Sequence, residues 1–69
     1  MGATVRVEAW PELMSRDLAA AYLSCSPRKL DDLQRAGHVI PLRSHAGKRF
    51  SRKELDSYIS RLPEWDDGK

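Results

Sequence analysis

The chain has 69 residues, a formal net charge of +2 and a single cysteine, Cys25. This length allows one domain and leaves little room for an enzymatic cleft. A lone cysteine excludes an internal disulfide framework and the paired spacing of a zinc site, so we expect a reducing, cytoplasmic compartment. No apolar run reaches the length of a membrane span and no signal-peptide pattern opens the chain, so we expect a soluble protein.

The charges are segregated along the chain. Between residues 27 and 53 there are eight Lys or Arg residues and two acids, a local charge of +6, whereas the remainder carries −4. A segregated basic segment is typical of proteins that bind polyanions. An ordinary solvated surface is the alternative interpretation, and the charge alone favours neither.

The first twelve residues show a brief alternation, with Val5 and Val7 on either side of Arg6. This pattern indicates either a short edge strand or a disordered arm over residues 1–12. We expect Trp10 to pack back onto the domain as a structural anchor, with a role in contacting a partner as the alternative.

Two short helices are expected next, over residues 16–23 and from residue 27 onward. Ser15 and Ser26 can cap them, and Pro27 suits the first helical position because its missing N–H is not needed there. Gly37 is expected just past the second helix in the left-handed conformation. Two helices joined by three residues predict a helix-turn-helix. The inward-facing residues are Leu18, Ala21 and Tyr22 in the first helix and Leu30 and Leu33 in the second.

A β-hairpin follows the two helices. Residues 38–43, HVIPLR, read as a strand with Ile40 and Leu42 on one face, and Pro41 confines this strand to a sheet edge. Residues 48–51, KRFS, return as the second strand. The connection, SHAG, is about four residues long and contains the glycine that hairpins favour.

A third helix is expected after Ser51, which forms a capping box with Glu54. Its apolar residues recur at positions i, i+3, i+4 and i+7: Leu55, Tyr58, Ile59 and Leu62. The order of elements predicts a mostly α-helical fold with a small β-hairpin, a winged helix-turn-helix over residues 13–62, followed by a flexible acidic tail over residues 63–69. The expected core comprises Leu18, Tyr22, Leu30, Leu33, Ile40, Leu42, Phe50, Leu55, Tyr58, Ile59 and Leu62.

The second predicted helix carries cations at the end where they are least favoured. Arg28 and Lys29 lie in its first turn, where their positive charges oppose the helix dipole and no compensating structural contact is evident. Solvated decoration is one interpretation. Contact with duplex DNA explains the conflict better, because the second helix of a helix-turn-helix enters the major groove, where its early residues reach base edges. The predicted contacts are Ser26, Pro27, Arg28, Lys29 and Asp32.

Two of these residues have alternative roles. Ser26 can bond a phosphate, cap its own helix, or do both. Asp32 can accept a hydrogen bond from a cytosine amine, or pair with Arg28 or Arg35 at helical spacing.

The hairpin tip, RSHAGKRF, holds a glycine, three cations and a histidine within eight positions. Such a tip suits the DNA backbone or the minor groove, where arginine follows the more negative potential of narrow A·T tracts. Charged hairpin tips are also common simply because loops lie in water. The predicted contacts of this wing are Arg43, His45, Gly47, Lys48 and Arg49.

Further contacts with the DNA backbone are predicted for Ser15, Arg16, Arg35, Arg52 and Lys53. For Arg52 and Lys53, pairing with Asp56 is an equally good explanation.

The sequence indicates no catalysis, metal or cofactor. It contains no G-x-S-x-G motif, no phosphate loop and no paired carboxylates placed over a pocket. His38 and His45 have no carboxylate or thiol at a spacing suited to a metal site. We therefore expect a binding protein without enzymatic activity and without membrane contact.

The ordered motifs resemble the excisionase-type winged-helix family, relatives of the DNA-binding domain of MerR regulators. The resemblance rests on LMSRDLAAAYLSCSPRKLDDLQRAGHVIPLR followed by GKRFSRKELDSYI, most of the chain. The shared pattern is an A-A-x-L helix, a helix that opens with serine and ends in glycine, an I-P strand, a basic glycine wing with an aromatic residue, and a closing helix of the form x-[DE]-L-x-x-[YWF]-[IL]. Ser24 stands where glycine is usual, and Pro27, Asp31 and Asp32 make the second helix unusual.

This resemblance implies a function. Phage excisionases are small recombination directionality factors that bind and bend attachment-site DNA so that integrase excises rather than integrates; prophage transcriptional regulators of similar size belong to the same family. By that likeness Ser26, Arg28 and Lys29 take the recognition-helix role. The implied partners are duplex DNA, a phage integrase and further copies of the chain on DNA, with a monomer or weak oligomer in solution. A protein-interaction module that does not bind DNA is the remaining alternative, favoured by Trp65 in the tail.

Overall fold

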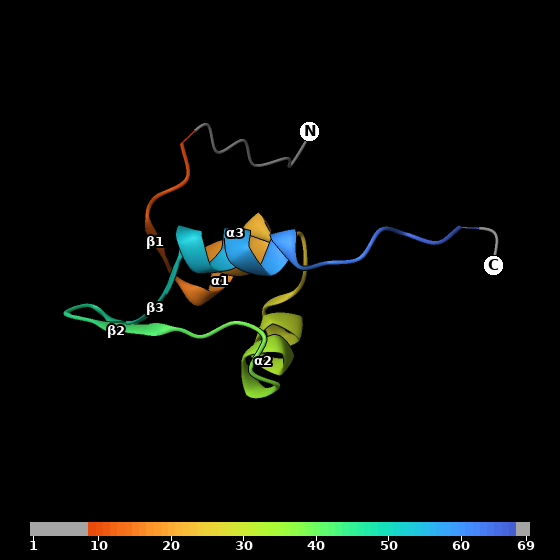
Figure 1. Cartoon of the computed structure of the whole chain (residues 1–69). Helices are drawn as coiled ribbons and strands as arrows, with labels where there is room; N and C mark the ends of the chain where they lie inside the picture. The colour runs from red at the N-terminus through yellow and green to blue at the C-terminus, as the bar shows by residue number, and fades with distance from the viewer. Residues whose placement is uncertain (1–8, 68–69) are drawn as a thin grey trace, which may run out of the picture.

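The computed structural model describes residues 9–67, which form three helices and a three-stranded antiparallel sheet (Figure 1). This architecture is compatible with a helix-turn-helix that carries a hairpin. Val5 and Val7, for which a short strand or a disordered arm was predicted, lie outside the described residues. The elements in chain order are β1 (Leu13–Met14), α1 (Arg16–Tyr22), α2 (Pro27–Arg35), β2 (Leu42–Ser44), β3 (Gly47–Ser51) and α3 (Arg52–Ser60).

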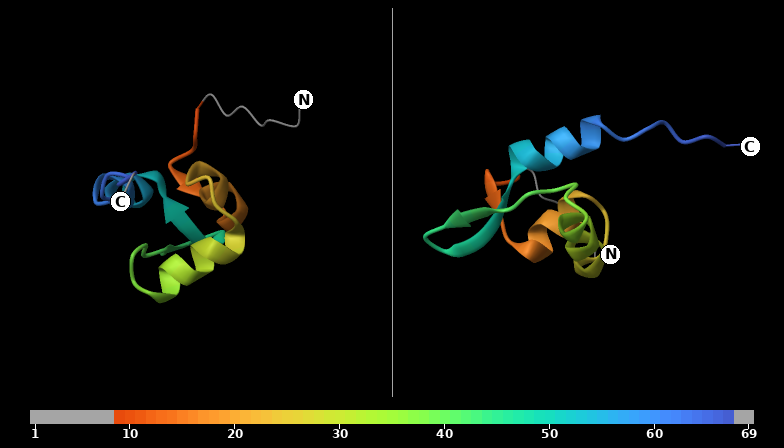
Figure 2. Two further views of the ribbon diagram at one scale, coloured as in Figure 1. Left: turned by 90° about the vertical axis from the view of Figure 1, so that its right-hand side faces the viewer. Right: turned by 60° about the horizontal axis from the view of Figure 1, so that its bottom comes forward.

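Strand β3 is the centre of the fold. It pairs with β1 on one side and with β2 on the other, both antiparallel. Figure 2 shows β3 running between α1 and α3, with α2 beneath α1. The β2–β3 hairpin extends away from the helices, and the chain leaves α3 in the opposite direction (Figure 1). The sheet and the three helices therefore share a core on one side of β3, while the hairpin tip stands free.

Each helix begins at a serine, as the sequence predicts. The side-chain oxygen of Ser15 accepts the Leu18 N–H at 3.2 Å, and that of Ser26 accepts the Lys29 N–H at 3.1 Å. Ser51 accepts the Glu54 N–H at 2.9 Å. These bonds satisfy backbone donors that the first helical turn leaves free, each worth about 1 kcal/mol.

The predicted capping box of α3 is only half formed. The carboxylate of Glu54 does not return to Ser51 but accepts the backbone N–H of Ile40 at 3.2 Å. This bond fixes the segment before β2 against the start of α3. It also satisfies a backbone donor that lies outside the sheet, because β2 begins only at Leu42.

The first helix buries different residues from those expected. Ala19 and Ala20 are fully buried, Leu18 and Tyr22 are half-buried, and Ala21 is exposed. The small alanine side chains let α1 approach both α2 and β3 closely. The helix also ends one residue earlier than predicted, at Tyr22.

Strand β1 was not predicted. Leu13 pairs with Ser51 and Met14 with Phe50, and the Met14 side chain is fully buried. Two residues are too few to show the alternation that identifies a strand in a sequence. The backbone N–H of Arg52 extends the pairing by donating to the carbonyl of Glu12 at 2.8 Å.

The prediction for the first hairpin strand was wrong in its bounds and its inward face. Strand β2 begins only at Leu42, and Val39 is fully buried, whereas Ile40 is 62% and Leu42 is 49% exposed. The residues before Pro41 therefore pack as a loop and insert Val39 into the core. The connection is also shorter than expected, because Ser44 pairs with Gly47 and leaves only two residues between the strands.

The predicted core is confirmed in its centre and wrong at its edges. Leu30, Phe50 and Leu55 are fully buried, and Leu18, Tyr22, Leu33 and Tyr58 are half-buried against them. Ile59 and Leu62 are 43% and 50% exposed; Ile59 lies in the last turn of α3, and Leu62 follows that helix, which ends at Ser60. Trp10 packs on the core edge-to-face with Tyr22, with ring centroids 4.9 Å apart, which confirms its role as an anchor.

Candidate nucleic-acid interface

The turn between α1 and α2 determines how α2 is presented. Ser24 adopts a left-handed backbone conformation, with φ of 57°, and its N–H donates to the carbonyl of Ala21 at 3.0 Å. The next N–H, of Cys25, donates to the carbonyl of Ala20 at 2.9 Å. These bonds end α1 and redirect the chain within the four residues that separate it from α2, one more than predicted, at a position where a left-handed backbone favours glycine.

The first turn of α2 presents two cations to solvent. Arg28 and Lys29 are exposed, and their side chains form no hydrogen bond or ion pair with any other residue in 9–67. Ser26 and Pro27 precede them as the cap and the first helical residue, as predicted. The next residue, Leu30, is fully buried and anchors this turn to the core.

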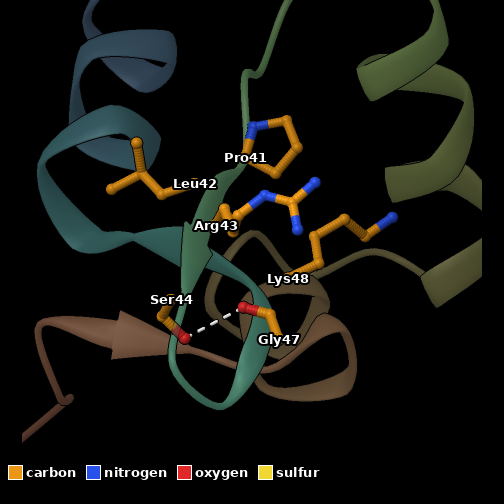
Figure 3. Close-up of a pocket in the computed structure, with 6 residues that line it drawn as sticks. All are labelled: Pro41, Leu42, Arg43, Ser44, Gly47 and Lys48. Atoms are coloured by element: carbon orange, nitrogen blue, oxygen red, sulfur yellow. Dashed lines mark hydrogen bonds between the residues drawn. The ribbon is translucent and has the colours of Figure 1, made fainter.

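The hairpin places two cations opposite each other. Arg43 on β2 is the direct partner of Lys48 on β3, and both side chains extend to the side of the hairpin that faces α2 (Figure 3). Residues directly opposite in an antiparallel pair have Cβ atoms about 5 Å apart, and like charges there are destabilising. Both residues line an open depression of about 350 Å³, with Pro41, Leu42, Ser44 and Gly47 as its other walls.

The tip of the hairpin is held by its own polar groups. The hydroxyl of Ser44 donates to the carbonyl of Gly47 at 2.9 Å and accepts the Ala46 N–H at 3.1 Å. Gly47 has φ of 104°, a conformation that a side chain would strain. His45 is exposed at the tip.

Arg49 lies on the opposite face of the hairpin from Lys48, because successive side chains of a strand alternate. It pairs with Leu42, is half-buried, and donates from its guanidinium to the Lys48 carbonyl at 2.8 Å. The predicted wing residues therefore divide between two faces, and only Arg43 and Lys48 are directed towards α2.

Lys48 connects the hairpin to α2. Its ammonium donates to the side-chain oxygen of Gln34 at 3.0 Å and lies 5.9 Å from the centre of the Phe50 ring. Gln34 was not singled out in the sequence. In the sequence, the only indication that Gln34 belongs to this site is its position three residues after Asp31, on the next turn of α2.

Four of the five predicted backbone contacts are engaged within the fold, Arg35 among them through Asp32. The guanidinium of Arg16 forms two bonds to Asp31, at 2.9 and 2.8 Å. Ser15 caps α1. Arg52 donates to the Trp10 carbonyl at 2.6 Å and to Glu12 at 3.1 Å, so it fastens the segment before β1 rather than pairing with Asp56.

Asp32 follows the pairing interpretation. It lies 3.2 Å from the Arg35 guanidinium, three residues along α2, with both side chains largely exposed. Lys53 is exposed, and within the described part of the chain its side chain contacts no acid. Asp56 instead accepts a hydrogen bond from the hydroxyl of Tyr22, which raises the pKa of that hydroxyl.

Other kinds of site are not indicated. Among residues 9–67, no group of three His, Cys, Asp or Glu side chains is placed to hold a metal ion. No helix in that range is long and apolar enough to cross a bilayer. The thiol of Cys25 is half-buried, and burial raises its pKa, which is the opposite of activation.

No protein-family model matches this chain, and neither a curated protein nor a solved structure is significantly similar to it.

Proposed function

We propose that this chain is a winged helix-turn-helix protein that binds duplex DNA, with α2 in the major groove and the β2–β3 hairpin as the wing. The observation that carries the proposal is the cross-strand pair of Arg43 and Lys48, two like charges on the side of the hairpin that faces α2. Like charges in this register reduce stability unless an anion lies between them. The bond from Lys48 to Gln34 puts that pair beside α2, where Arg28 and Lys29 carry further positive charge.

The contact would be mainly electrostatic. Arg43 and Lys48 suit backbone phosphates, Arg49 extends the positive surface onto the other face of the hairpin, and Arg28 would contact base edges or phosphates. A single module of this size covers about 600–1,000 Å² of its own surface on DNA, which gives modest affinity. Useful occupancy then requires several copies side by side on one DNA site.

Within this class we propose the role of an excisionase. The chain would bind attachment-site DNA cooperatively and bend it, so that a phage integrase excises rather than integrates. The ordered set of motifs from the A-A-x-L helix to the closing aromatic helix supports this role. A small prophage-type transcriptional regulator with the same DNA-binding mode is the alternative. Recombination of attachment-site DNA by integrase, with and without the protein, separates the two: only an excisionase raises the yield of excision.

A protein-interaction module without DNA binding is the second alternative. The observation that favours it is the exposure of large apolar side chains, with Trp65 at 85%, Ile40 at 62% and Leu62 at 50%. Exposed aromatic residues often anchor protein interfaces. Under this alternative the basic surface would dock an acidic protein, and the protein would show no affinity for DNA at low salt.

The experiment that tests the DNA proposal is a fluorescence-anisotropy titration of labelled duplex DNA. Wild type is compared with an Arg43→Ala, Lys48→Ala variant and with Arg61→Gln. Arg61→Gln also removes a positive charge, but outside the hairpin. The Arg61 guanidinium contacts Ser57 and the carbonyl of His38. The hairpin variant should bind more weakly than both other proteins. Equal binding by all three would contradict the proposed interface.

A further inference from the structure

One acid lies among three cations where α1, α2 and β3 meet. The Asp31 carboxylate of α2 accepts two bonds from the Arg16 guanidinium of α1, at 2.9 and 2.8 Å. Lys48 of β3 and Arg35 of α2 also stabilise its charge, so that the pKa of Asp31 lies below its usual value, chiefly because of Arg16. Together with Gln34, these four residues line an open depression of about 420 Å³.

The pair of Arg16 and Asp31 is accessible to a competing anion. The side chain of Arg16 is 47% exposed and that of Asp31 is 33% exposed. The two parallel bonds that Arg16 makes to this carboxylate have the same geometry as those that a guanidinium makes to a phosphate. The carboxylate thus holds the position at which a phosphate oxygen would meet Arg16.

We propose that Asp31 is an internal competitor of DNA phosphate and thereby limits the affinity of the protein for DNA. It holds Arg16 in the free protein and competes with backbone phosphate for that guanidinium in the complex, so that wild type gains little from this contact. The inference rests on the proposed DNA binding and adds a function for one acid at the edge of the interface.

This competition lowers the overall affinity for DNA. Breaking the pair of Arg16 and Asp31 offsets most of what the new phosphate contact contributes, and the Asp31 charge then remains near the DNA. Affinity for any duplex, whatever its sequence, is therefore reduced, because phosphate contacts supply the sequence-independent part of binding. Base contacts of α2 are not affected, so the ratio of specific to non-specific affinity is unchanged.

The neighbouring acid provides a matched control. Asp32 has the same charge on the same helix but makes one 3.2 Å contact, to Arg35, with both side chains more than half exposed. Exposed pairs of this kind contribute little and hold their cation only loosely. Neutralising Asp32 changes the net charge by the same amount as neutralising Asp31, without releasing Arg16.

The test measures binding to random duplex DNA over a salt series for wild type, Asp31→Asn and Asp32→Asn. Releasing Arg16 adds about one phosphate contact, which steepens the slope of log K against log salt by about 0.9. Asp31→Asn should therefore bind more tightly than wild type, with a gain about 3.5-fold larger at about 50 mM than at about 200 mM salt. Asp32→Asn should show a smaller gain and no added contact.

A double-mutant cycle identifies Arg16 as the released group. Arg16→Gln should have little effect on the affinity of wild type but should return Asp31→Asn to nearly wild-type affinity and slope. An equal effect of Arg16→Gln in both backgrounds would overturn the inference. So would weaker DNA binding by a folded Asp31→Asn protein, because the pair would then be only a brace between α1 and α2.

Folding is checked by circular dichroism and thermal melting, with Asp31→Ser as a second replacement. Loss of the fold in both variants would also overturn the inference, since it would make the pair a structural requirement. If the proposed DNA binding itself is wrong, the result is different: neither wild type nor any folded variant would bind DNA, even at low salt.

Discussion

Ser24 adopts the one left-handed backbone conformation of a non-glycine residue in the described chain, with φ of 57°. For an L-residue this conformation costs about 1–2 kcal/mol. Glycine avoids that cost, but it is more flexible in the unfolded chain and loses more entropy on folding, which offsets part of the gain. Ser24→Gly should therefore stabilise the domain by about 0.5–1 kcal/mol.

The measurement is thermal unfolding, in which Ser24→Gly should raise Tm by about 2–8 °C. The control is Ala21→Gly, three residues earlier and exposed within α1. It should lower stability by about 1 kcal/mol, because glycine is unfavourable in a helix interior. A lower Tm for both variants would show that the serine side chain, not the backbone, governs this turn.

The hydroxyl of Tyr22 makes stability depend on pH in the alkaline range. It donates to Asp56 and so joins α1 to α3, and this bond raises the pKa of Tyr22 above its value in the unfolded chain. A raised pKa in the folded state stabilises the protein fully below the unfolded pKa of about 10 and less as pH rises through the folded value. Wild type should therefore lose stability above pH about 10 more steeply than Tyr22→Phe does.

Thermal melts between neutral pH and pH about 11 check this dependence. Tyr58→Phe is the matched control, since within residues 9–67 the hydroxyl of Tyr58 forms no hydrogen bond. Parallel pH curves for wild type and Tyr22→Phe would show that the bond to Asp56 contributes nothing to folding.

At the scale of elements, the segment before β2 is fixed by one buried side chain. Val39 is fully buried, while the neighbouring Ile40 is 62% exposed. Val39→Ala should destabilise the domain by about 2 kcal/mol through lost burial and the cavity left behind. Ile40→Ala should change stability by less than about 0.5 kcal/mol. Urea unfolding measures both free energies. A larger effect at Ile40 than at Val39 would contradict the assignment of Val39 as the core residue of this segment.

Some features of the fold could be predicted from the sequence, and others could not. Three serine caps, the first position of Pro27 and the left-handed Gly37 were predictable, because each depends on a local rule. The inward face of the segment before β2 was not predictable. It depends on a bond from the backbone of Ile40 to Glu54, fourteen residues away, which no pattern in the sequence reveals.

The candidate site was predictable in composition but not in arrangement. Arg28 and Lys29 are exposed on α2 as expected. The division of the wing into two faces follows from the register, in which Arg43 meets Lys48 and Leu42 meets Arg49. That register is the one expected from the sequence, since shortening the connection from four residues to two only adds the pair of Ser44 and Gly47. The sequence does not reveal the bond that joins the hairpin to α2, from Lys48 to Gln34, fourteen residues away.

At the scale of the whole molecule, the segregated charges of the sequence are partly neutralised by folding. In the free protein Arg16 pairs with Asp31 and Arg52 with Glu12, so two of the cations predicted to contact DNA are engaged by acids of the chain itself. Cations outside these pairs remain on the hairpin, in the first turn of α2 and, with Lys53, on α3. The acidic residues of the tail lie beyond α3, which extends away from the hairpin (Figure 1). The cations of the hairpin and the acids of the tail therefore lie at opposite ends of the molecule.

The measurement that tests the central claim most directly is the salt dependence of binding to random duplex DNA. If five or six cations meet phosphates, log K should fall with log salt at a slope of about −5 for wild type. Arg43→Ala with Lys48→Ala should make the slope shallower by about 2, while Arg61→Gln should leave it nearly unchanged. A folded wild-type protein that does not bind DNA at low salt, or binds with a slope that the hairpin variant shares, would contradict the account.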